Sequence, residues 1–307
     1  KGVTLNKGDD FDVSVARKSG GYEIAVSGRA YDSRPVLQMV IHGDGLSSSG
    51  GSDVSLSANF GRMSGFNGQV MESVVVRYDT RGGRLHLLDI KGAIGGELSQ
   101  ISAQAQGNAT TFGFKADNAG GSLAMVNLYD KMQSGRLSAS LTRTGNGPFS
   151  GRVSIKDFVV VGEERLASLT AAPAPAKLQR ASGRLRELDL RRVKFDDLKA
   201  NIIKAPSRLE VDKGWLRNAQ IGLTFDGILF DEADRMNLRG TFMPLFALSR
   251  VIGEIPVIGD IFSNGKNSGL IGITYRLRGP SNNPGIAVNP LSIVAPGIFR
   301  EIFEFRN

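Results

Sequence analysis

The chain has 307 residues, of which 41% are hydrophobic and 22% charged, a net charge of +8 and no cysteine. This composition indicates a folded chain of one large or two average domains, and it excludes disulfides and thiolate metal sites. The absence of any apolar run near 18 residues predicts no membrane-spanning helix, and the spread of the charge without like-charged blocks argues against nucleic acid as a partner.

Alternation of polar and apolar residues dominates the first two-thirds of the chain and predicts short strands. Phe11, Val13 and Val15 show it first, and glycine-containing turns such as 80–83 and 144–147 separate the segments. The pattern predicts an antiparallel meander with one apolar and one polar face. Further strands are expected at 53–60, 84–90, 97–106, 110–116, 136–142, 151–161, 182–195, 197–205, 207–216, 219–231, 236–242, 268–279 and 285–289.

Helical spacing of apolar residues interrupts the strands at a few places. Short helices are expected at 33–43, where Pro35 suits the first turn, at 118–135, where Gly135 is a plausible stop, and at 163–172. A further helix is expected at 244–262, with a kink or end at Pro256. The linker-like segment 172–176 divides the chain into two predicted parts, 1–170 and 177–307.

A final amphipathic helix is expected over 289–305, starting at Asn289 and Pro290. Its apolar stripe either plugs the end of the β structure or contacts a membrane interface, and the sequence leaves both open. The residues of this stripe are Ile298, Phe299, Ile302, Phe303 and Phe305.

The sequence offers little for catalysis or for binding of a metal or cofactor. Of the two histidines, His86 alternates within a strand and His42 ends a helix, and no nucleophile–base arrangement or phosphate-binding loop is recognisable. The acidic clusters around residues 9–12, 196–197 and 231–234 lack calcium-loop spacing and are expected to be solvated turn residues, with a weak calcium site as the alternative. We therefore expect no enzyme, no cofactor and no metal.

The apolar face of the predicted sheet says more about function than the histidines and acidic clusters do. An apolar sheet face must be buried against something, and the helices available to cover it are few and short. Either the sheet closes on itself as a sandwich or barrel, or part of the face is left for a ligand that asks for no hydrogen bonds, such as an acyl chain. Candidate inward positions are Val153, Ile155, Leu223 and Phe225.

The last third of the chain contains motifs that resemble those of a known protein family. Segment 238–305 resembles the C-terminal region of AsmA-like proteins of Gram-negative bacteria, in particular the YhdP-type branch. The resemblance rests on Gly240-Thr241, IPVIGDIF (255–262), GLIGITYRLRG (269–279) and VNPLSIVAPG (288–297). Weaker matches lie at 119–137, 149–161 and 194–202.

The resemblance implies an elongated, twisted antiparallel sheet curled into a single open, taco-like hydrophobic groove that continues through both parts of the chain. It also implies the periplasmic, C-terminal part of a protein anchored in the inner membrane, similar to bridge-like lipid transfer proteins. Such a protein would conduct phospholipids passively toward the outer membrane or a partner protein there. The alternative is assembly of outer-membrane proteins, as for the TamB-like relatives. Candidate groove or cap residues near the distal end are Ile252, Ile255, Val257, Ile258, Ile261 and Phe262.

Overall fold

The computed structural model describes residues 2–3, 5–6, 8–43, 51–171, 190–244 and 270–294. The chain divides into two compact units. Unit 1 comprises Lys1–Val159 and Asn201–Leu209, and unit 2 comprises Val160–Ala200 and Glu210–Asn307.

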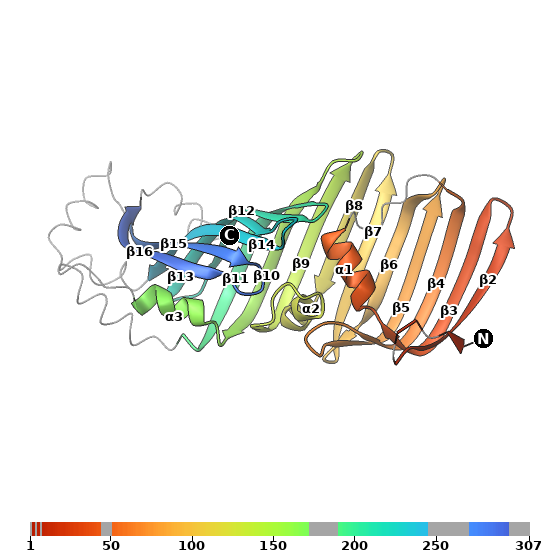
Figure 1. Cartoon of the computed structure of the whole chain (residues 1–307), viewed down its shortest axis with the longest axis horizontal. Coiled ribbons are helices and arrows are strands. Elements are labelled where there is room, and N and C mark those ends of the chain that lie inside the picture. Colours follow the sequence, from red (N-terminus) through yellow and green to blue (C-terminus); the bar gives the residue numbers. More distant parts are fainter. Residues whose placement is uncertain are drawn as a thin grey trace. The chain divides into compact units, whose positions relative to one another are not determined.

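The described residues form one 16-stranded sheet whose strands follow one another in chain order, with three short helices (Figure 1). The helices are α1 (Arg34–His42), α2 (Ala119–Met125) and α3 (Glu164–Ala171). The strands are β1 (Gly2–Val3), β2 (Asp10–Lys18), β3 (Gly21–Asp32), β4 (Asp53–Ser64), β5 (Val70–Arg81), β6 (Arg84–Ile94), β7 (Glu97–Gln106), β8 (Ala109–Ala116), β9 (Met132–Thr144), β10 (Phe149–Val161), β11 (Arg192–Ala205), β12 (Arg208–Arg217), β13 (Ile221–Phe230), β14 (Arg235–Pro244), β15 (Leu270–Pro280) and β16 (Gly285–Val294).

The sheet is open, because β1 and β16 stand at the two ends of the strand order. The prediction of a mainly β chain with few short helices is confirmed, and the strands predicted at 84–90, 97–106, 110–116, 136–142 and 151–161 all lie within observed strands.

One strand pair departs from the predicted antiparallel meander. Strands β3 and β4 are parallel, in register from Gly21 opposite Asp53 to Asp32 opposite Ser64. Parallel neighbours need a crossover connection instead of a tight turn, and the segment that contains α1 supplies it. The neighbouring pairs, β2 with β3 and β4 with β5, are antiparallel.

The helix predicted at 118–135 is much shorter in the structure. It ends at Met125, Asn127 has a left-handed φ of 58°, and β9 begins at Met132. Gly135 is therefore not a helix stop. It lies within β9 at a φ of +91°, where an added Cβ would come within 2.7 Å of the Phe158 Cβ.

Two further predictions, one of a helix and one of a strand boundary, need correction. Strand β16 continues to Val294, so no helix starts at Asn289 and Pro290. Asn289 pairs with Thr274 and Ser292 with Gly272, and the register shift between them falls at Pro290, which has no N–H to donate to the ladder. Likewise, β11 runs unbroken from Arg192 through the two aspartates at 196–197, where the sequence predicted separate strands.

The core of unit 1 lies where the strands meet the start of α1 and the end of α2. Aromatic rings pack edge to face there, with 5.9 Å between the ring centroids of Phe11 and Phe60, and Tyr31 stacks on Phe60 at 5.2 Å. We call the following buried residues the core cluster: Phe11, Ala58, Phe60, Met71, Val74, Ile94 and Met125.

Candidate functional site

Strand register builds a continuous apolar surface on one side of unit 1. From β2 to β9 the paired residues line up across eight strands in two apolar rows. We call these two rows the apolar face. Row A comprises Val13, Val26, Ala58, Val76, Ile90, Ile101, Phe114 and Ala139, and row B comprises Val15, Ile24, Leu56, Tyr78, Leu88, Ala103, Phe112 and Leu141.

The opposite side of the same strands is polar. Residues between the rows pair across the sheet as Ser57 with Arg77, Arg77 with Asp89, and Asp89 with Ser102. Partial burial, which alone would raise the pKa of Asp89, is outweighed by hydrogen bonds from Lys91 and Gln100, so that the pKa is lowered. This face is therefore suited to water, as the alternating sequence pattern predicted.

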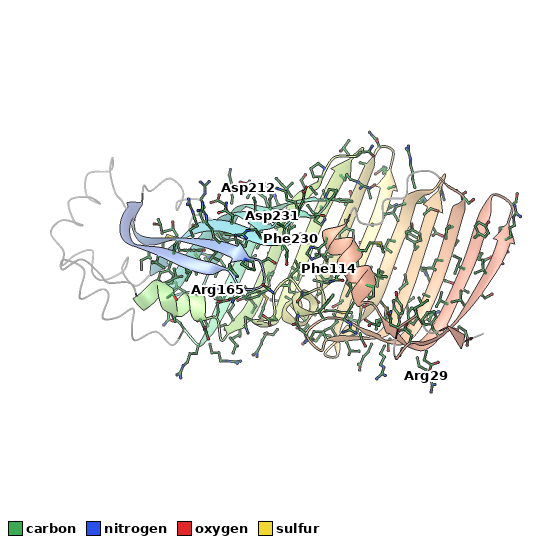
Figure 2. All side chains as sticks on the ribbon, viewed as in Figure 1. Arg29, Phe114, Arg165, Asp212, Phe230 and Asp231 are labelled. Carbon is green, nitrogen blue, oxygen red and sulfur yellow. The ribbon has the colours of Figure 1, made fainter. Side chains whose placement is uncertain are left out.

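The apolar face is only partly covered by the described chain. Ala58, Leu88 and Ala103 are buried, whereas Val15 is 60% exposed and the other row members are half-buried. Phe114, labelled in Figure 2, is one of these half-buried residues and lies near the β9 end of row A, between Ile101 and Ala139. Apolar area left in contact with water costs about 25 cal/mol per Å². A face of this extent is therefore suited to an apolar ligand.

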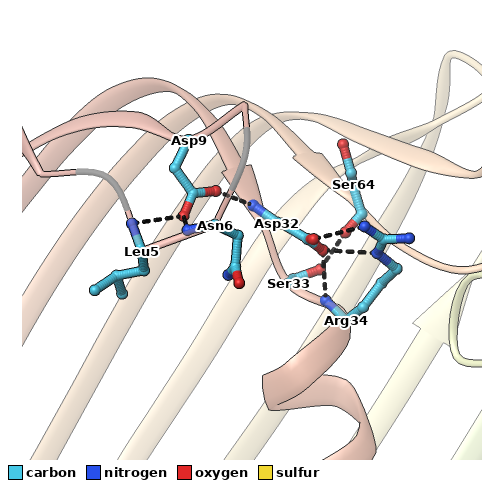
Figure 3. Close-up of polar contacts among 7 residues, drawn as sticks. All are labelled: Leu5, Asn6, Asp9, Asp32, Ser33, Arg34 and Ser64. Atoms are coloured by element: carbon cyan, nitrogen blue, oxygen red, sulfur yellow. Dashed lines mark hydrogen bonds and ion pairs between the residues drawn. The ribbon is translucent and has the colours of Figure 1, made fainter.

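A hydrogen-bonded anchor holds the start of α1 next to this face (Figure 3). The Asp9 carboxylate accepts the backbone N–H of Asn6 at 2.8 Å and that of Asp32 at 2.7 Å. Ser33, which is 1% exposed, donates its hydroxyl to the Ser64 carbonyl at 2.9 Å. Hydrogen bonds from Arg34, which outweigh the effect of burial, lower the pKa of Asp32.

These contacts correct one of the sequence predictions. Asp9 is not a solvated turn residue, because its side chain is buried and binds backbone N–H groups. Asp196 and Asp197 lie within a strand rather than in a turn. Asp231 is a turn residue as predicted, and its Oδ1 accepts the N–H groups of Ala233 and Arg235.

The far end of α1 is held by residues distant in the sequence. The backbone N–H and the hydroxyl of Ser207, in the turn between β11 and β12, each donate to the His42 carbonyl at 2.8 Å. Lys204 Nζ lies 3.3 Å from the Gly43 carbonyl oxygen. No sequence signal indicated these contacts, although the prediction that His42 ends a helix is confirmed.

Helix α1 lies on the apolar side of unit 1, because its Leu37 packs against the core cluster. None of its residues is buried, and Val36 and Met39 are 36% and 54% exposed. In Figure 1 the helix, in orange, crosses in front of β6 to β8. The apolar residues of α1 therefore remain available to a ligand on this side of the sheet.

Two of the predicted inward residues, Val153 and Ile155, lie on β10. The Phe149 ring on this strand is 6.4 Å from that of Phe112 in row B. Because alternate residues of a strand share a face, Val153 and Ile155 extend the apolar face onto β10. Ile155 is 3% exposed and Val153 is half-buried.

Unit 2 contains a second apolar surface, which includes the other two predicted residues. Leu223 pairs with Phe242 and Phe242 with Ile273, and all three are at most 5% exposed. Phe225, half-buried, lies two residues further along the same face of β13. The candidates Ile252, Ile255, Val257, Ile258, Ile261, Phe262, Ile298, Phe299, Ile302, Phe303 and Phe305 lie outside the described residues.

Within the described ranges, no group of three or more histidine, aspartate or glutamate side chains is placed to hold a metal ion. No helix among these residues has the length and hydropathy to span a membrane. Comparison of the chain with protein-family models, with curated proteins and with solved structures found no match.

Proposed function

We propose that this protein carries phospholipids, whose acyl chains lie on the apolar face while their head groups stay in water. The observation that carries the proposal is the pair of apolar rows, uninterrupted over eight strands yet half-exposed. No bond is made or broken. In keeping with the AsmA-like resemblance, we place the chain in the periplasm as part of a bridge between inner and outer membrane.

The chemistry of the rows supports an acyl chain as the occupant. A hydrocarbon chain asks for no hydrogen bonds, and the row members offer none apart from the Tyr78 hydroxyl. Seven strand spacings of about 4.8 Å make each row about 34 Å long. Neighbouring positions along a row are chemically similar, so an acyl chain moves between them without entering water.

The position of α1 supports a concave apolar face within unit 1. The helix starts beside Ser64 at the end of β4 and ends at Ser207 just after β11. These strands are fourth and eleventh in the sheet order, about 34 Å apart if the sheet were flat. A helix of 9 residues is about 13.5 Å long. Curvature toward the side of α1 accounts for the shorter direct distance.

Basic residues near the ends of several strands give the head group a suitable environment. Next to row B, Arg17 pairs with Tyr22 at one end of the apolar face and Arg143 with Thr110 at the other, so each end carries a basic residue. Arg81 and Arg84 are exposed on either side of the turn between β5 and β6. Phosphate groups of lipids would find cations here without leaving water.

Lipid extraction and vesicle transfer test the proposal. We expect phospholipid to co-purify with the chain expressed in a Gram-negative host, and we expect the chain to speed transfer of a fluorescent phospholipid between vesicles. A chain that purifies without lipid and leaves the transfer rate unchanged contradicts the proposal.

A second candidate function, assembly of outer-membrane proteins, is favoured by the exposed edge of β2. Strand β1 pairs only with Asp12 and Phe11, and the described chain pairs no strand with the same edge of Val13 to Lys18. An unpaired strand edge can capture an extended client segment. A lipid-free chain that binds an outer-membrane strand peptide, and loses it on Val15→Pro substitution, would favour this function over lipid transport.

A further inference from the structure

We infer that α1 is a hinged strap over the apolar face, and that acyl chains enter when its C-terminal end is released. The inference rests on the proposed lipid-carrying function and adds how access to that site is controlled. It follows from the different ways in which the two ends of α1 are held.

The N-terminal end is built as a fixed hinge. Ser33 is buried and binds Ser64 through both its N–H, at 3.0 Å, and its hydroxyl, at 2.9 Å. The preceding Asp32 N–H donates to the buried carboxylate of Asp9. The two side chains that make these bonds, Ser33 and Asp9, belong to buried residues, so exchange of the protein partners for water is unfavourable.

The C-terminal end is held more weakly. The His42 carbonyl accepts both the backbone N–H and the hydroxyl of Ser207 at 2.8 Å, but the hydroxyl bond is exposed to solvent and neither residue is buried. The contact of Lys204 with Gly43 is long at 3.3 Å. Lys204 Nζ also has a closer acceptor, the Ala205 carbonyl at 2.6 Å. Because water can replace these contacts, this end is the one that opens.

The apolar side chains of α1 are suited to cover an apolar ligand. Leu37, Val40 and Ile41 recur at helical spacing and share one side of the helix. Each of them is only half-buried, so this apolar side is not fully covered. Leu37 packs against the core cluster. An acyl chain under the strap would complete the burial of this side, and release of His42 from Ser207 would admit the chain laterally.

A reversible disulfide between the end of α1 and the turn between β11 and β12, here called the lock, tests the strap directly. The natural chain has no cysteine, so the double variant His42→Cys with Ser207→Cys contains one possible disulfide. We expect the oxidised variant to take up a pyrene-labelled phosphatidylglycerol from vesicles at least tenfold more slowly than the same protein after reduction. Equal rates in the two states, with the disulfide confirmed by mass spectrometry, would overturn the inference.

Weakening the contacts of Ser207 and Lys204 with the end of α1, here called the latch, should have the opposite effect. Ser207 has a φ of 50°, so glycine is accommodated there, and Ser207→Gly with Lys204→Met removes the side-chain contacts. We expect at least threefold faster uptake and faster hydrogen exchange of the α1 amides than in the natural chain. The control variant Lys115→Met, on the polar face, should change neither, and a latch variant with unchanged uptake and exchange contradicts the strap.

The outcomes separate the two proposals. If the natural chain takes up the labelled lipid, and lock and latch variants behave like it, the strap is wrong and the lipid-carrying function stands. If the natural chain takes up no lipid in any state, the lipid-carrying function itself fails, and the strap fails with it.

Discussion

At the residue scale, the account depends on which side of a strand each side chain occupies. Ile101 is in row A of the apolar face, between Ile90 and Phe114, whereas Gln104 lies on the polar side of the same strand. A charge on the apolar side would have to be desolvated whenever an acyl chain covered it.

We therefore predict that Ile101→Asp weakens binding of a fluorescent phospholipid at least about tenfold, which corresponds to about 1.4 kcal/mol. The matched variant Gln104→Asp should bind as the natural chain does. Equal affinity of the two variants, with folding checked by circular dichroism, would show that the rows do not contact lipid.

A second residue-scale prediction concerns pH. Because hydrogen bonds from Arg34 lower the pKa of Asp32 in the folded state, its stabilising effect is present above the unfolded pKa of about 3.9 and is lost as the pH falls through the folded value. We expect Asp32→Asn to lower the unfolding free energy by about 1 kcal/mol at pH 7. In thermal unfolding followed from pH 7 to pH 3, the difference should shrink below about pH 4. A difference that is constant with pH would contradict this.

At the element scale, glycine–aromatic pairs hold neighbouring strands in unit 2. The Tyr275 hydroxyl donates to the Thr224 carbonyl at 2.8 Å, and its ring crosses over Gly240, which pairs directly with Tyr275. A Cβ on Gly240 would come within 2.6 Å of the Tyr275 oxygen. Burial, with a smaller effect of Asp226, raises the pKa of Tyr275, so the hydroxyl remains a donor.

We predict that Gly240→Ala destabilises the chain by about 2 kcal/mol, because ring and backbone must move. Tyr275→Phe should cost about 1 kcal/mol through the lost hydrogen bond. Urea unfolding measures both. A Gly240→Ala variant as stable as the natural chain would mean that the ring does not lie over this glycine.

The local sequence patterns predicted which segments form strands better than they predicted how the strands pair. The alternation in 97–106 and 110–116 was sufficient to place β7 and β8, because each strand has one polar and one apolar side. Strand β5 was not predicted, since its bulge between Glu72 and Val75, with Ser73 at a φ of 52°, interrupts the alternation. The parallel pairing of β3 with β4 is set by the crossover through α1, and no short pattern encodes it.

At the scale of the whole molecule, the apolar face arises from register. The sequence predicted that apolar sides exist, and it predicted Val153 and Leu223 on them. It did not predict that Val13 to Ala139 line up across eight strands, because register depends on every turn and bulge in between. The bonds from Ser207 to His42 join residues 165 apart in sequence, and no local preference encodes such a contact.

Site-specific photocrosslinking in a Gram-negative host tests most directly whether acyl chains occupy the apolar face. A photoreactive phenylalanine would replace Ile90, Phe114 or Leu141 on the apolar face, and Lys91, Lys115 or Thr142 on the polar face of the same strands. We predict phospholipid adducts, identified by mass spectrometry, at the first three positions and none at the other three. Adducts that are absent from the apolar positions, or equally frequent on both faces, would contradict the account.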